Sequence, residues 1–125
     1  MSTTIFTPKT IRTNPSNSET TIEQNQIVRL VSYSLYLDDA RKLPEGYDFL
    51  ARNLDEFKTA ILIWGMPYLM SLDHDLGETE NGMMALKWLY GKDFDIQNTE
   101  IRLHSDNWHG RKNMESYINS WIKST

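Results

Sequence analysis

Cysteine is absent from the 125 residues of this chain, which excludes disulfides, thiolate nucleophiles and zinc sites built on thiolates. No apolar run approaches the ~20 residues that a membrane-spanning helix needs. Residues 1–4 contain no basic segment leading into an apolar stretch, as a secretory signal would. These absences predict a soluble, cytoplasmic protein with no membrane partner.

An excess of positive charge is also missing. Lys and Arg number 13 against 17 Asp and Glu, so the formal net charge is −4. The chain therefore lacks the general positive field that attracts nucleic acid by bulk charge. Hydrophobic residues make up 39% of the sequence, which is enough apolar surface for one folded core.

The first 26 residues differ in composition from the rest. They are rich in Thr, Ser, Asn and Gln, and we predict a polar N-terminal extension over residues 1–26, ahead of a domain over residues 27–125. Two β-prone pieces lie within it, at residues 4–7 and 10–13. Two alternatives stay open: either the extension is disordered or loosely docked, or these pieces pair with a sheet edge or with a second subunit, forming a homodimer.

Short apolar runs alternate with helical patterns in the predicted domain. The runs predict strands over residues 33–37, 47–51, 68–72 and 100–104. Helices are predicted after Asn53, Asn81 and Asn107, because asparagine often caps a helix. This alternation predicts an α/β fold with a mainly parallel, four-stranded sheet and helices on both of its faces, and ligands bind such folds at the carboxyl ends of the strands.

Acidic residues follow two of the predicted strands, in the positions Asp38, Asp39 and Asp73. Closely packed carboxylates repel one another unless a cation or raised pKa values offset their charge, and hard oxygen ligands favour Mg²⁺ or Mn²⁺. We predict that these three residues hold the metal ion. The alternative is that Asp only occupies turn positions, which suit it.

Two histidines also follow predicted strands. We predict that His74 and His104 are the catalytic acid and base, together with Asp75, because imidazole titrates close to neutral pH and neighbouring strand ends would share one pocket. The structural alternative is that each histidine only forms hydrogen bonds within its loop.

Groups that attract anions lie close by in the sequence. We predict that Ser105, Asn107 and Arg41 bind phosphate, because the free amides of a helix start and a guanidinium are both suited to anions. Helix capping and solvated surface charge are the structural alternatives for these residues.

Three motifs carry a resemblance to a known family. They are Leu37-Asp38-Asp39-Ala40-Arg41, Ser71-Leu72-Asp73-His74-Asp75-Leu76-Gly77 and His104-Ser105-Asp106-Asn107. Together they resemble the cyclic-phosphate processing receiver-like domain, a divergent relative of the response-regulator receivers of bacteria and phages, over roughly residues 33–121. The resemblance implies a trimmed receiver-like (flavodoxin-like), three-layer fold. It also implies that Asp38, Asp39 and Asp73 bind Mg²⁺ and that Ser105 contacts a phosphoryl group.

Two features of signalling receivers are not evident in the sequence: a helix between the first two strands, and a fifth strand that carries a lysine. The resemblance therefore favours metal-dependent hydrolysis of a cyclic phosphate, such as a 2′,3′-cyclic phosphate RNA end or nucleotide. The expected partner is a phosphorylated small molecule or an RNA end. The alternative is a non-catalytic binding module, or a phospho-signalling module with Asp73 as the acceptor.

Overall fold

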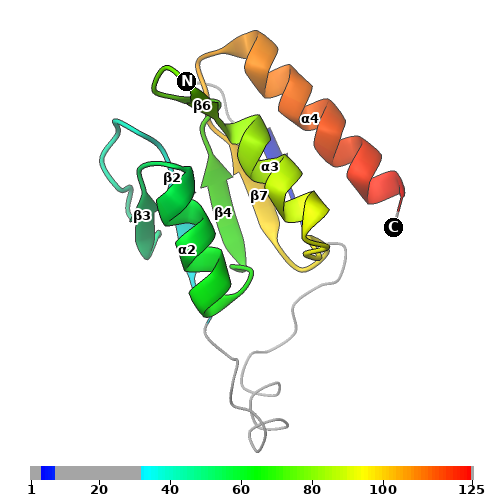
Figure 1. The fold of residues 1–125 in the computed structure, drawn as a ribbon, viewed down its shortest axis with the longest axis horizontal. Coiled ribbons are helices and arrows are strands. Elements are labelled where there is room, and N and C mark those ends of the chain that lie inside the picture. The colour runs from blue at the N-terminus through cyan, green and yellow to red at the C-terminus, as the bar shows by residue number, and fades with distance from the viewer. Residues whose placement is uncertain (1–3, 8–31, 125) are drawn as a thin grey trace, which may run out of the picture.

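The computed structural model describes residues 4–7 and 32–124, in which strands and helices alternate along the chain (Figure 1). The main sheet is formed by β1 (Thr4–Phe6), β2 (Ser34–Leu37), β3 (Phe49–Ala51), β4 (Leu69–Leu72) and β7 (Glu100–Leu103). The helices are α2 (Leu54–Trp64), α3 (Gly82–Gly91) and α4 (Trp108–Lys123). A small hairpin of β5 (Asp75–Leu76) and β6 (Glu80–Asn81) replaces the loop expected before α3.

The main sheet has five strands in the order β1-β7-β4-β2-β3, so the predicted count of four is wrong. The predicted strands β3, β2, β4 and β7 are parallel to one another, and the fifth strand, β1, pairs antiparallel with β7. The parallel strands follow the flavodoxin-like order, in which a fifth parallel strand would lie beside β7. Here β1 takes that position, because the exposed edge of β7 offers free backbone donors and acceptors.

This pairing bears on the N-terminal segment. Of the alternatives for residues 4–7, the structure supports pairing with a sheet edge. The second β-prone piece, residues 10–13, lies outside the described residues, and the division of the chain at residue 26 stays a prediction.

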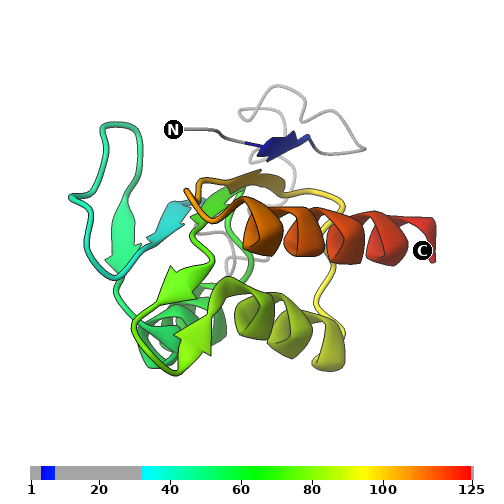
Figure 2. The same ribbon diagram turned by 90° about the horizontal axis from the view of Figure 1, so that it is seen from above.

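All three helices of the described part of the chain lie on one face of the sheet, so the predicted three-layer arrangement is wrong for this part (Figure 2). The chain moves in the same direction across the sheet from β3 to β4 and from β4 to β7, and right-handed crossovers therefore place α2 and α3 on the same side. The connection from β2 to β3 runs the opposite way. It is a loop over residues 38–48 in place of a helix, and this loop rises on the other face.

The predicted helix starts are confirmed. The side chains of Asn53, Asn81 and Asn107 each accept a hydrogen bond from a backbone N–H three residues later, at 2.9 to 3.0 Å. Such caps satisfy donors that have no partner within the helix. The helix α2 ends at Gly65, whose φ of 82° suits glycine.

The two faces of the sheet differ in chemistry because side chains alternate along each strand. The helix-covered face carries the apolar core, with Leu35, Leu37, Met70, Leu72, Ile101 and Leu103. The opposite face carries Ser34, Tyr36, Ser71 and Arg102, of which the first three are buried. No helix of the described residues covers this opposite face, which we call the helix-free face, and its buried side chains are mainly polar.

The packing of one side of β1 against the core can be tested by mutation. Phe6 packs against the core, whereas Ile5, the next residue, is 53% exposed. We expect Phe6→Ala to lower the free energy of unfolding by about 1–3 kcal/mol, below the 3–5 kcal/mol of a fully buried phenylalanine. The control Ile5→Ala should change it by less than about 1 kcal/mol. Urea unfolding measures both, and equal effects would contradict the packing of β1 described above.

Candidate functional site

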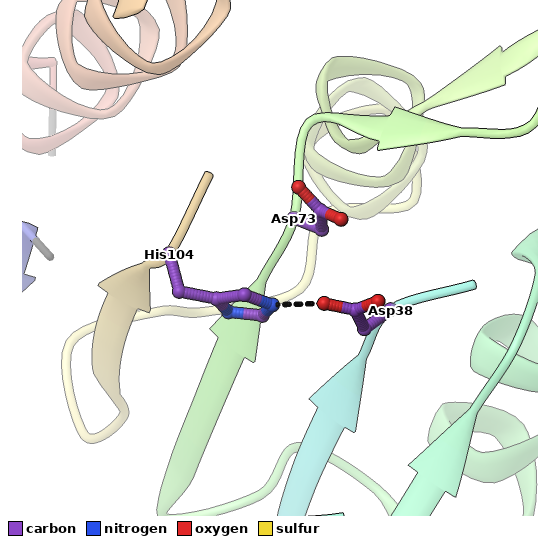
Figure 3. A group of neighbouring side chains, drawn as sticks. All are labelled: Asp38, Asp73 and His104. Carbon is purple, nitrogen blue, oxygen red and sulfur yellow. Dashed lines mark hydrogen bonds and ion pairs between the residues drawn. The ribbon is translucent and has the colours of Figure 1, made fainter. Parts of the chain in front are cut away.

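The sheet register brings three residues into one row. Leu37, Leu72 and Leu103 are register partners across β2, β4 and β7, so the residues that follow them are Asp38, Asp73 and His104. One ligand atom from each of these three lies within 4.8 Å of the others (Figure 3). All three residues are buried, with exposed fractions of 1%, 7% and 4%. The structure therefore brings Asp38, Asp73 and His104 together, as their strand ends predicted.

Four donors surround the carboxylate of Asp38. Its Oδ1 accepts hydrogen bonds from the backbone N–H groups of Ala40 and Arg41, each at 2.9 Å. Its Oδ2 accepts from Arg41 Nη1 and from His104 Nε2, also at 2.9 Å. Burial would raise the pKa of Asp38, but these donors outweigh burial and lower the pKa to about 2. Asp38 is thus held as a carboxylate.

Asp73 has the opposite electrostatic balance. Burial raises its pKa, and the negative charge of Asp38 raises it further. Hydrogen bonds from the Ser105 side chain and the His74 backbone N–H, with the charge of Arg41, only partly offset this, so the pKa is about 6. Asp73 is therefore less readily ionised than Asp38, and an additional positive charge beside it would favour its charged form.

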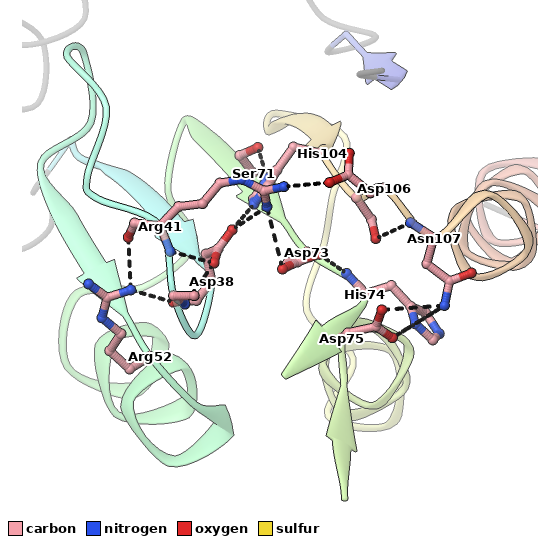
Figure 4. A network of polar contacts seen from close by, with 12 residues as sticks. Asp38, Arg41, Arg52, Ser71, Asp73, His74, Asp75, His104, Asp106 and Asn107 are labelled. Atoms are coloured by element: carbon pink, nitrogen blue, oxygen red, sulfur yellow. Dashed lines mark hydrogen bonds and ion pairs between the residues drawn. The ribbon is translucent and has the colours of Figure 1, made fainter. Parts of the chain in front are cut away.

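Arg41 supplies a cation to this cluster. Its Nη1 lies 2.9 Å from Asp38 Oδ2 and 3.7 Å from Asp73 Oδ2, and its Nη2 lies 3.1 Å from Asp106 Oδ2 (Figure 4). The Arg52 side chain donates to the backbone carbonyls of Asp38 and Arg41, at 3.2 and 2.8 Å. Arg52 thereby braces the turn that directs Arg41 toward the acids.

His104 uses both ring nitrogens within the protein. Nε2 contacts Asp38, and Nδ1 lies 2.6 Å from Ser71 Oγ. The ring is stacked on Tyr36, with a centroid distance of 4.3 Å and an interplanar angle of 7°. Burial lowers the pKa of His104, and the hydrogen bond to Asp38 opposes that shift. His104 is therefore an internal support of the acid cluster in this geometry.

His74 lies on the other side of Asp73. Its Nδ1 is 2.8 Å from Asp75 Oδ1, and Asn107 Nδ2 donates to the same carboxylate oxygen at 3.2 Å. A Cβ added to Gly110 would lie 2.4 Å from His74 Cγ, so only glycine lets the ring pack so closely against α4. His74 and His104 thus contact different partners, and neither residue lines the crevice at this edge of the sheet.

A crevice of about 390 Å³ opens at this edge of the sheet. Its walls include most of the predicted site residues, namely Asp38, Asp39, Arg41, Asp73, Asp75 and Ser105. The exposed Asp39 lies in the wall outside the compact group of three. His74 and Asn107 do not line the crevice, but both contact the carboxylate of Asp75, which does. A second hollow, of about 380 Å³ between α2 and β3, has a mainly apolar lining and contains none of the predicted site residues.

Three contributors to the site were missed by sequence reasoning: Ser71, Tyr36 and Arg52. Ser71 and Tyr36 lie inside strands, and their period-two spacing from the strand ends was a usable signal, since it places them on the same face as Asp38 and His104. Arg52 is distant in sequence from its partners, and no local pattern indicated its contact.

The site and the order of the parallel strands define a receiver-like α/β domain, with acids and a serine at the carboxyl ends of adjacent strands. The chain belongs to the family of the cyclic-phosphate processing receiver domain, whose model matches residues 33–120. Searches of curated proteins and of solved structures found no match. Among the described residues, none of the helices combines the length and the apolar character needed to cross a membrane.

The raised pKa of Asp73 predicts a pH dependence of stability in the metal-free protein. The folded-state pKa of about 6 lies above the ordinary value of 3.8, so the titration of Asp73 lowers the stability of the folded protein as the pH rises from about 4 to 6. Asp73→Asn removes this titration. We expect the variant to gain stability over wild type across that window, by up to about 3 kcal/mol at neutral pH.

Urea unfolding in the presence of a chelator, repeated between pH 4 and 7, measures this difference. The control Asp39→Asn changes an exposed carboxylate of the same crevice and should show no comparable rise. If the difference in free energy of unfolding between Asp73→Asn and wild type stayed constant from pH 4 to 7, the pKa of Asp73 would not be raised in the folded protein.

Proposed function

We propose that this domain hydrolyses a cyclic phosphoester, such as a 2′,3′-cyclic phosphate on a nucleotide or an RNA end, with the help of a divalent cation. The observation that carries the proposal is the pair of carboxylates of Asp38 and Asp73, which share one crevice with the cationic group of Arg41 between them. Membership of the cyclic-phosphate processing receiver family supports the substrate class.

The donor set suits a hard divalent cation. Asp38 and Asp73 offer carboxylate oxygens, which Mg²⁺ and Mn²⁺ prefer, and Asp39 in the crevice wall offers a third. The contact of Arg41 with both buried acids shows that positive charge is favourable at this point. We therefore assign Asp38, Asp39 and Asp73 as the residues that would hold the metal.

A bound divalent cation would polarise a phosphoryl oxygen and offset the charge that develops on the phosphate. The phosphate itself would be held by the hydroxyl of Ser105, by backbone amides at the start of α4, and by Arg41. A bound cation would take over the role of Arg41 between the acids, and the guanidinium, on a side chain that is 32% exposed, would then be available to the substrate. Asn107 caps α4 and keeps this helix start in place.

Hydrolysis adds water across one P–O–C ester bond of the ring. The oxygen of water becomes bonded to phosphorus, one proton passes to a base, and the released ester oxygen takes up a proton to become a hydroxyl. The pair of His74 and Asp75 is our candidate for these transfers. Asp75 lines the crevice and accepts a hydrogen bond from His74 Nδ1, so Asp75 would meet the reacting groups and His74 would act through it.

Metal binding can be tested without any substrate. Calorimetric titration with Mn²⁺ should give a single site, and Asp73→Asn should weaken it by more than about 10-fold, since even outer-shell changes cost that much. Arg41→Ala should strengthen Mn²⁺ binding, because the guanidinium no longer competes for the carboxylates. Lys58→Ala, in which the changed lysine lies over Trp88, is the matched control for the loss of one positive charge. Absence of Mn²⁺ binding at millimolar concentration would refute the metal site.

Hydrolysis is tested with 2′,3′-cyclic nucleotides and with RNA ending in a cyclic phosphate, in the presence of Mn²⁺ or Mg²⁺. The expected product is a phosphomonoester, which phosphorus NMR distinguishes from the cyclic substrate. His74→Ala should lower the rate by ~10²–10⁴-fold, as removal of an acid or base typically does. His109→Ala, an exposed histidine in contact with Trp108, should leave the rate unchanged.

The outcomes separate the candidate functions. An inactive wild type that still binds Mn²⁺ would overturn hydrolysis and favour a binding module. Stoichiometric phosphorylation of Asp73 by acetyl phosphate would favour a signalling module. We expect no such labelling, since the strand beside β7 is β1, whose residues Thr4–Phe6 include no lysine.

A further inference from the structure

A chain of buried polar groups leads from the middle of the sheet to the acid cluster. Ser71 Oγ lies 2.6 Å from His104 Nδ1, and His104 Nε2 lies 2.9 Å from Asp38 Oδ2. All three residues are less than 5% exposed. Buried groups of this kind are normally kept because each satisfies the next.

The position of each proton follows from the partners. The carboxylate of Asp38 only accepts hydrogen bonds, so the proton of neutral His104 must be on Nε2. Nδ1 is then an acceptor, and the hydroxyl of Ser71 must donate to it. If Ser71 accepted a proton from Nδ1 instead, the lone pair of Nε2 would face a carboxylate oxygen, which is repulsive. Asp38 thus sets the tautomer of His104, and the hydroxyl of Ser71 supports it by donating to the ring nitrogen that has no proton.

The sheet explains why a histidine performs this task. β4 lies between β2 and β7, and adjacent strands are about 4.8 Å apart, so a side chain from the end of β7 must cross β4 to reach Asp38. The imidazole is long enough, and it passes Ser71 of β4 on the helix-free face. The stacked ring of Tyr36 fixes its plane. The contacts with Asp38, Ser71 and Tyr36 together fix the position of the His104 ring.

We propose that Ser71 and His104 are positioning residues that orient the carboxylate of Asp38 for cation binding. The role of Asp38 rests on the proposed function, whereas the bonding between the three residues does not. A bound cation would replace Arg41, the other side-chain donor to Asp38 Oδ2, and His104 would then remain as the side chain that holds this oxygen. An outer partner of this type typically contributes 10–100-fold to metal affinity.

The same contacts exclude two other roles for His104 in this geometry. Its Nε2 proton is directed at Asp38 and its Nδ1 lone pair is used by Ser71, so neither nitrogen is available as a metal ligand. A proton shuttle would need a path to the substrate, and the ring is 4% exposed. His104 therefore acts through Asp38.

The first test reads the tautomer directly. Nitrogen-15 NMR of the imidazole side chains in the metal-free protein should show His104 protonated at Nε2 and unprotonated at Nδ1. In Ser71→Ala the donor to Nδ1 is lost, and the Nδ1 resonance should shift toward that of a free lone pair. Ser34→Ala removes a buried serine of the same face that bonds to Asp48 rather than to His104, and it should leave the His104 signals unchanged. Protonation of His104 at Nδ1 in the wild type would overturn the assignment.

The second test separates positioning from catalysis. His104→Gln can still present an N–H near the position of Nε2, whereas His104→Ala cannot. We expect Mn²⁺ affinity to fall about 10-fold in His104→Ala and to recover in His104→Gln. Equal losses in the two variants would overturn the positioning role. If wild type bound no Mn²⁺, the proposed metal site would fail, and the NMR experiment would still decide whether His104 donates to Asp38 and accepts from Ser71.

Discussion

Repulsion between the carboxylates of Asp38 and Asp73 is the constraint on which the rest of the site depends. Parallel pairing of β2 with β4 in the observed register leaves these acids side by side at the edge of the sheet. Two buried negative charges at this spacing cannot both be stable without compensation. The protein compensates one acid with four hydrogen-bond donors, and leaves the other with a raised pKa. The site is therefore electrostatically asymmetric.

This asymmetry has a structural origin in the helix-free face of the sheet. A helix between β2 and β3 would cover that face with apolar side chains, but the short loop over residues 38–48 leaves room for polar ones. The loop supplies Arg41 and two backbone N–H groups to Asp38, while the face itself supplies His104, Ser71 and Tyr36. The loop that stands in place of a helix between β2 and β3 is therefore what makes room for the buried polar network around Asp38.

Much of this architecture is encoded locally and could be predicted. The capping asparagines, the apolar strand runs and the acids at strand ends are each patterns of a few neighbouring residues. The parallel sheet was predicted from the alternation of strands and helices. The pairing of β1 with β7 could only be left as one alternative, because it joins distant parts of the chain. The bracing of Arg41 by Arg52, and the separation of His74 from His104, depend on where side chains turn after the strand ends. Local sequence patterns carry no information on such turns.

The position of β1 has a consequence for the order of folding. β1 is synthesised well before its partner β7, and the described elements between them include the other strands and the helices α2 and α3. Pairing over such a sequence separation pays a large loop-closure entropy and tends to be slow. Because Thr4 pairs with Leu103, the residue just before His104, this late step would occur next to the acid cluster. The strand end that carries His104 would then gain its last backbone pairing late in folding, after β2, β4 and β7 have already paired with one another.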